Sequence, residues 1–160
     1  ADLTAPVVTG VIDGQLTNSN VTPASADTDI DTVSLTKGGS AVAGYTLGTA
    51  INDEGVYVLT VTDKSGNFTV VNFEIDTTAP APVSSPLMLS DGFKASGLEV
   101  GATVKVVNAG DTAANTAVST ATVDSNGDVT VTGLTTVTFY EVFVIDAAGN
   151  ASVGLSITTI

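Results

Sequence analysis

The clearest pattern in the chain is an alternating hydrophobic run that ends in a tight turn, and it occurs twice. Residues 57–62 and 140–145 each begin with Tyr, continue through β-branched residues and lead into Asp-x-x-Gly-Asn. Alternation with period two is typical of a half-buried β-strand. Gly66 and Gly149 supply the positive φ that a tight reversal needs, and a second extended run follows each turn. The sequence therefore predicts two similar β-hairpins.

The same alternation predicts further short strands in both halves of the chain. On residues 68–75, the odd-numbered side chains are the more apolar and are expected to face the core. No amphipathic helix of useful length is present, and turns recur about every 8–12 residues, which is typical of a β-sandwich. The strands expected in the first half are residues 7–12, 21–22, 32–37, 41–45, 50–51, 56–62 and 68–75. Those expected in the second half are residues 103–107, 119–123, 129–132, 139–145 and 151–160. Before them, Pro80, Pro82 and Pro86 suit an irregular edge strand.

Two repeats indicate that the chain is two domains. Asp63 and Asp146, which open the two matching turns, lie 83 residues apart, about the length of one small sandwich domain. The pattern Asp-x-Thr-Ala-Pro also precedes each half, at residues 2–6 and 76–80. We therefore predict an all-β chain of two tandem immunoglobulin-like β-sandwiches, residues 1–79 and 80–160, joined by a short Thr/Pro linker that is extended and stiff.

The composition disfavours several classes of partner, metal and reaction. The net charge is −13, from 17 acids against 4 lysines, so nucleic acid and anionic lipid are poor partners and cations are good ones. The chain has no Cys and no His, which disfavours zinc and a catalytic nucleophile activated by a base. With no Trp and few aromatics, a carbohydrate-binding cleft is also disfavoured. No apolar run reaches the ~18 residues that span a bilayer. No N-terminal signal segment is visible, so we expect a mature form or an excised fragment.

Several stretches resemble tandem bacterial immunoglobulin-like domains of large exported surface proteins. The first half carries Ala-Pro-Val-Val-Thr-Gly-Val-Ile-Asp-Gly at residues 5–14 and Gly-Val-Tyr-Val-Leu-Thr-Val-Thr-Asp-Lys-Ser-Gly-Asn at residues 55–67. The second half looks like a sister type, through Gly-Ala-Thr-Val-Lys-Val at residues 101–106 and Asp-Ala-Ala-Gly-Asn at residues 146–150. The resemblance implies a spacer or lattice building block of a surface-layer protein or a giant adhesin, with calcium often stiffening the junctions between domains.

Calcium is the metal that fits these residues, because it binds carboxylate and carbonyl oxygens from flexible loops. The alternative for each acid is a solvated loop residue or a turn cap. In an immunoglobulin-like sandwich the loops sort to two ends, so we expect calcium at two levels. Asp2, Asp27, Asp29, Asp31 and Asp63 are expected to meet at one end of the first domain. Asp76 is expected to meet Asp146 near the linker, and the further candidates are Asp53, Glu54, Asp124 and Asp128.

These observations lead to a functional hypothesis. We expect a non-catalytic structural module of a secreted bacterial cell-surface protein, of a surface layer or cell-wall array, rigidified by calcium. A stalk or ligand-binding segment of an adhesin is the alternative. Neighbouring domains of the same polypeptide and lattice copies of itself are the expected partners, without nucleic acid or membrane insertion. Tyr57 and Tyr140 hold the tyrosine-corner position, and we expect core rings whose hydroxyls bond a nearby carbonyl.

Overall fold

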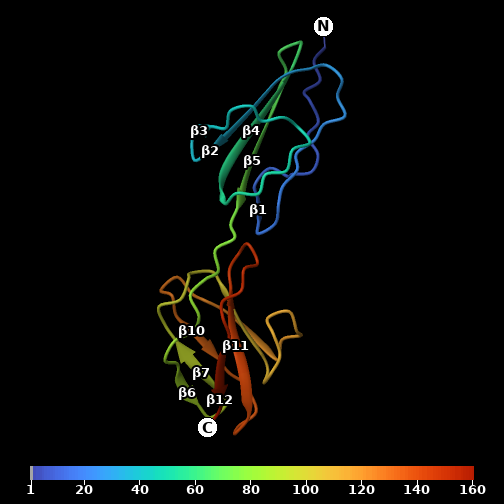
Figure 1. Cartoon of the computed structure of the whole chain (residues 1–160). Coiled ribbons are helices and arrows are strands. Elements are labelled where there is room, and N and C mark those ends of the chain that lie inside the picture. Colours follow the sequence, from blue (N-terminus) through green and yellow to red (C-terminus); the bar gives the residue numbers. More distant parts are fainter. Residues whose placement is uncertain (1) are drawn as a thin grey trace. The chain divides into compact units, whose positions relative to one another are not determined.

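The computed structural model describes residues 2–160 and divides into two compact units, Ala1–Thr77 and Thr78–Ile160. Strands β1 to β12 follow one another along the chain (Figure 1). Residues 2–160 form no helix, so this part of the chain holds no helical membrane span. The prediction of an all-β fold is confirmed.

The first unit is built on one sheet, in the order β1-β5-β4-β2-β3. Strands β4 and β5 form the predicted hairpin, and β1 pairs with β5 in parallel while the other neighbours are antiparallel. The strand bounds are β1 (Gln15–Thr17), β2 (Ile30–Lys37), β3 (Ser40–Ala41), β4 (Gly55–Asp63) and β5 (Phe68–Ile75).

One face of this sheet carries the core of the first unit. On β5 the odd-numbered residues Val71, Phe73 and Ile75 are buried, as the alternation predicts. The Phe73 ring stacks on Tyr57 of β4, with ring centroids 5.1 Å apart. Burial of such rings is a major source of stability in a small domain. The segments that cover this face bring in Val11, Val21 and Ile51.

Most of the segments predicted to form strands opposite this sheet do not form them. Residues 7–12, 21–22 and 50–51 contribute only isolated bridges, Thr9 with Ala24 and Val21 with Ile51, and β3 includes only Ala41 of the expected 41–45. The physical reason is local. Gly10 has a φ of +78° and lies so close to Thr22 that a side chain there would collide with the Thr22 carbonyl. Gly44 and Gly48 also have positive φ, which interrupts an extended run.

The second unit is a two-layer sandwich. Its sheets have the orders β10-β7-β6 and β12-β11-β8-β9. Phe93 and Val131 from the first sheet and Val104, Val142 and Val144 from the second lie in one buried cluster. The bounds are β6 (Leu87–Leu89), β7 (Gly92–Ala95), β8 (Thr103–Asn108), β9 (Ser119–Thr122), β10 (Val129–Val131), β11 (Phe139–Ile145) and β12 (Leu155–Thr158).

Three details of this unit depart from expectation. The β6–β7 hairpin was not predicted, because the surrounding prolines suggested an irregular edge. Strand β12 is shorter than the predicted residues 151–160, with Ala151 joined to Ile145 by a single bridge. Tyr57 donates its hydroxyl to the Asp53 carbonyl at 2.7 Å as expected, whereas the Tyr140 hydroxyl oxygen accepts from the Thr135 N–H at 3.1 Å.

Candidate metal centre

The turn between β4 and β5 fixes the Asp63 carboxylate. Its Oδ1 accepts the N–H groups of Ser65 at 2.8 Å and Asn67 at 2.9 Å, and its Oδ2 accepts Asn67 Nδ2 at 2.8 Å. Gly66 takes a φ of +88° and donates its N–H to the Asp63 carbonyl, which closes the turn. Asp63 is only 2% exposed. An ionised carboxylate with such donors is stable even where little water reaches it.

These donors also decide the charge state of Asp63. The Asn67 side-chain amide, with the N–H groups of Asn67, Ser65 and Gly66, lowers the pKa of the carboxyl below its ordinary 3.8, although burial opposes the effect. Hydrogen bonds to the charged form favour that form. Asp63 is therefore an anion at neutral pH.

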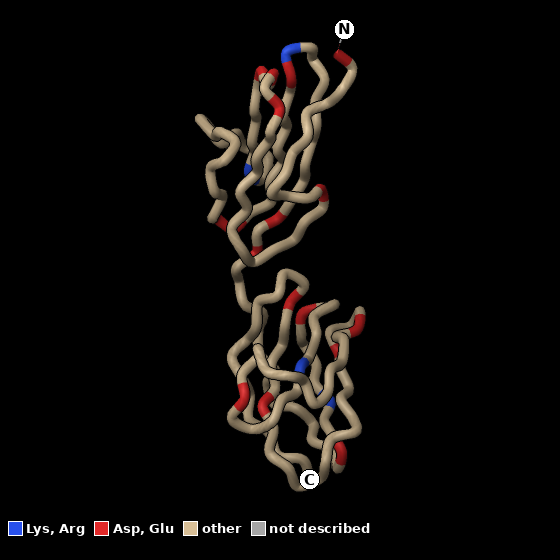
Figure 2. Tube along the Cα trace, turned by 90° about the vertical axis from the view of Figure 1, so that its right-hand side faces the viewer, with Lys and Arg blue, Asp and Glu red and all other residues tan. Residues whose placement is uncertain are grey.

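Two further acids lie beside Asp63. One carboxylate oxygen from each of Asp2, Asp29 and Asp63 can be chosen so that all three atoms lie within 4.8 Å of one another. The Lys64 N–H donates to the Asp29 carbonyl at 2.9 Å. Asn67 Nδ2 donates to the Asp2 carbonyl at 3.2 Å. The Asp63 turn is therefore hydrogen-bonded to the segments that carry Asp29 and Asp2. Figure 2 shows acids gathered at the end of the first unit that carries the N-terminus.

The chemistry of this group fits a hard divalent cation. Three carboxylates at such distances repel one another unless a cation lies between them, and calcium takes six to eight oxygen ligands with flexible geometry. Carbonyl oxygens of the same loops and water would complete the shell. Within residues 2–160 no other group of three acids meets this spacing.

Asp27 and Asp31 do not join the three-acid group. The Asp27 Oδ2 accepts the Val7 N–H at 2.6 Å and the Ser25 hydroxyl at 3.1 Å, so this carboxylate ties down the N-terminal segment. Asp31 is exposed on β2, where the pairing with β4 shifts between Ile30 and Thr32. Of the predicted acidic loop, the structure brings only Asp29 to Asp63.

The remaining predicted ligands lie outside the three-acid group and have other partners. Asp53 lies 3.9 Å from the Lys37 ammonium, and Glu54 accepts the Thr77 hydroxyl at 3.1 Å. Asp76 follows β5 and donates its N–H to the Thr17 carbonyl. Asp146, in the second unit, accepts the N–H and Nδ2 of Asn150, both at 2.8 Å. Ligation by these four residues stays a prediction.

The Asp63 turn has two counterparts in the second unit. The Asp124 Oδ1 accepts the N–H groups of Asn126 and Asp128, both at 2.9 Å, and Asp146 repeats the arrangement with Asn150. Gly127 and Gly149 also take positive φ, +82° and +94°. The motif Asp-x-x-Gly is therefore first a turn device, and only the Asp63 copy belongs to a three-acid group among the described residues.

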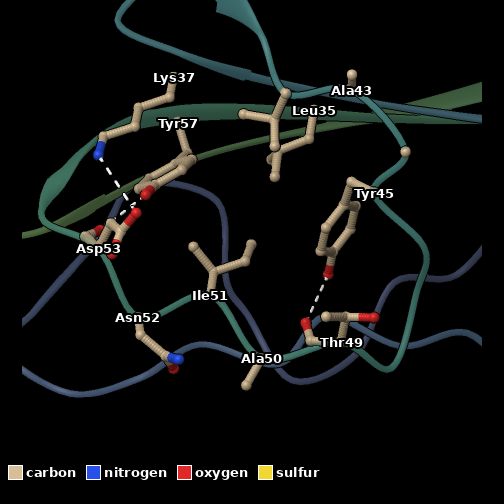
Figure 3. A pocket seen from close by; sticks show the side chains of 12 residues that line it. Leu35, Lys37, Ala43, Tyr45, Thr49, Ala50, Ile51, Asn52, Asp53 and Tyr57 are labelled. Atoms are coloured by element: carbon tan, nitrogen blue, oxygen red, sulfur yellow. Dashed lines mark hydrogen bonds and ion pairs between the residues drawn. The ribbon is translucent and has the colours of Figure 1, made fainter.

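A pocket of about 350 Å³ lies in the first unit (Figure 3). Leu35 and Ile51 form its apolar wall, and Tyr45 faces it from the side. The Tyr45 hydroxyl donates to the Thr49 carbonyl at 3.0 Å, and burial raises the pKa of Tyr45. Sequence analysis missed this pocket because residues 41–45 were expected to continue a strand.

The chain is similar in sequence to a known protein and in fold to several solved structures. The chain is 55% identical over 75 residues to an outer cell wall protein of Brevibacillus brevis. The aligned segment covers 47% of this chain and 8% of that protein. The chain therefore matches only a small part of that relative.

Among solved structures, the FN1–FN3 domains of chicken CNTN1 align with 98% of this chain and 67% of theirs, at 19% identity and a TM-score of 0.49. The fibronectin(III)-like modules of Clostridium thermocellum CbhA align with 96% of this chain and 94% of theirs, at 11% identity and a TM-score of 0.43. No protein-family profile matches the chain. The outer cell wall relative supports a secreted location, at the cell surface or in the cell wall.

Proposed function

We propose that this chain is a non-catalytic structural module of an exported bacterial surface layer or cell-wall array. The observation that carries the proposal is the 55% identity to a segment of an outer cell wall protein. The two all-β units, built from short strands around separate cores, suit a spacer or building block. The chain has no His or Cys to serve a nucleophile, which agrees with a role that needs no reaction.

We further propose that calcium binds the first unit at Asp2, Asp29 and Asp63. Residues 1–80 hold ten of the acids and two of the lysines, so a cation relieves a local excess of negative charge. Asp29 and Asp63 come from loops that are far apart in sequence, and Asp2 comes from the N-terminal segment. An ion shared by the three would fasten these segments together and stabilise that end of the unit.

Calorimetric titration of the whole chain with calcium tests the site. The chain should bind calcium, and Asp29→Asn should weaken binding because it removes one charge and leaves the Asp63 turn intact. Asp124→Asn is the matched control, since Asp124 holds a turn of the same design outside the three-acid group. Absence of calcium-dependent heat in the parent chain, or equal binding by Asp29→Asn, would remove this site from the proposal.

A further inference from the structure

The first unit has a sheet face that its own core does not use. Side chains on β2, β4 and β5 alternate between the core and the opposite side, which we call the outer face. On β4 and β5 the outer face presents Val56, Phe68 and Val70, which are 56%, 62% and 41% exposed. Exposed apolar side chains gathered on one face mark interaction surfaces more often than single scattered ones do.

This face is almost uncharged, although the chain carries 17 acids. Among the described strand residues that alternate to this side, Glu74 is the one with a charge, and the positions on β2 are Thr32, Ser34 and Thr36. Asp13 lies at the margin, where its Oδ1 accepts the N–H and Nδ2 of Asn72 at 2.8 and 3.2 Å. Polar groups thus border an apolar centre, as in many protein interfaces.

The outer face carries both a projection and a hollow. Phe68 stands at one end of β5, opposite Thr62. A shallow hollow of about 190 Å³ lies toward the other end, lined by Leu16, Val56 and the charged Glu74 among others. Four to six residues of β5 separate the two features, which is roughly 14–20 Å at the usual strand rise. Val70 lies near the midpoint.

We propose that the outer face is an interface between two copies of this chain, in which Phe68 of each copy enters the hollow of the other. A two-fold axis through the region of Val70 produces this exchange, because in a two-fold interface residue i meets j and j meets i. The same operation places Val70 against its own counterpart. The inference rests on the structural role proposed above and names one contact through which an array would form.

Charge favours a second copy over another occupant. Two copies of an acidic chain repel each other through most of their surfaces, and this face, with Glu74 as the one charged residue among its described strand residues, lets them approach with less repulsion. A basic partner would instead be attracted to the acidic loops. With β1, which contributes Leu16, the face spans four strands. At ~4.8 Å spacing and about six residues each they give a footprint on the order of 400 Å² per copy. That is about half of a standard interface, so the contact is weak alone and effective when repeated.

Cysteine crosslinking tests this contact in the whole chain, which has no Cys of its own. Val70→Cys places the new thiol near the proposed axis. Val153→Cys is the control, since Val153 is 72% exposed in the second unit. Under mild oxidation, Val70→Cys should form disulfide-linked dimers at least about tenfold faster than Val153→Cys, because a contact raises the effective concentration of the two thiols. Adding Phe68→Lys or Val56→Lys to Val70→Cys should return the rate to that of the control.

Two results would overturn the interface: equal crosslinking rates for the two cysteine variants, or a fast rate that neither lysine substitution lowers. Phe68 and Val56 are exposed, and urea unfolding of each variant checks that the fold is kept. The outcome is independent of calcium binding, which is measured in dilute chain. Failure of this contact would therefore leave the cation site standing, and failure of the cation site would leave the contact standing.

Discussion

Asp63 combines burial with a lowered pKa, and this makes the stability of the first unit depend on pH. Its folded pKa lies below the ordinary 3.8, chiefly through the Asn67 amide. A lowered pKa adds stability that is fully present above the unfolded pKa and is lost as pH falls through the folded one. In EDTA, Asp63→Asn should be less stable than the parent at neutral pH, and the gap should close below about pH 3.8. Urea unfolding followed by Tyr fluorescence measures this. A gap independent of pH would contradict the assignment.

Val137 is held in an unfavourable backbone conformation. It has a φ of +50° and is 77% exposed, and a β-branched residue seldom adopts this region. Asn tolerates it better, so Val137→Asn should raise the free energy of unfolding of the second unit by about 1 kcal/mol. Thermal unfolding of the two chains tests this, and a variant that is less stable than its parent would show that Val137 makes contacts that outweigh the strain.

At the scale of single elements, β5 has two faces with opposite energetic roles. Phe73 is 3% exposed and stacks on Tyr57, whereas Phe68 on the same strand is 62% exposed. Phe73→Ala should lose about 3–5 kcal/mol, a large part of the stability of a small domain. Phe68→Ala should change stability by no more than about 0.5 kcal/mol in dilute solution. Denaturant unfolding compares the pair, and similar losses would mean that the strand faces are misassigned.

Elements with a sustained alternation were predictable from sequence, and those without it were not. The bounds of β5 and β11 agree with the predicted 68–75 and 139–145, because each is a long alternating run with an Asp-x-x-Gly turn at one end, before β5 and after β11. Segments opposite the first sheet have short runs broken by Gly, so they form bridges instead. Strands β6 and β7 were not predicted, because the prolines nearby favour an irregular edge strand and the two strands are only three and four residues long.

The candidate site was predictable only in part. Sequence placed Asp2, Asp29 and Asp63 at one end of the first unit, since loop order in a sandwich decides which loops share an end. It could not separate Asp29 from Asp27 and Asp31, because neighbouring acids differ only in where their side chains point. The bond from the Val7 N–H to Asp27 depends on the path of a segment about 20 residues away, which local spacing does not encode.

At the scale of the whole molecule, the two units have separate hydrophobic clusters and different acid arrangements. The described part of the second unit has no three-acid group of the kind seen around Asp63. Calcium should therefore act mainly on the first unit, while the second supplies an internal control within the same chain. This asymmetry makes the calcium proposal testable without altering the sequence.

Hydrogen exchange of the whole chain, measured by NMR in calcium and in EDTA, tests the central claim most directly. An ion that binds only the folded state adds about 2.7 kcal/mol when its concentration is a hundred times Kd. The amides of β4, β5 and the Asp63 turn should exchange more slowly in calcium, and those of β8 and β11 should change little. Equal exchange of the first unit in calcium and in EDTA would contradict the account of this chain as a calcium-stabilised structural module.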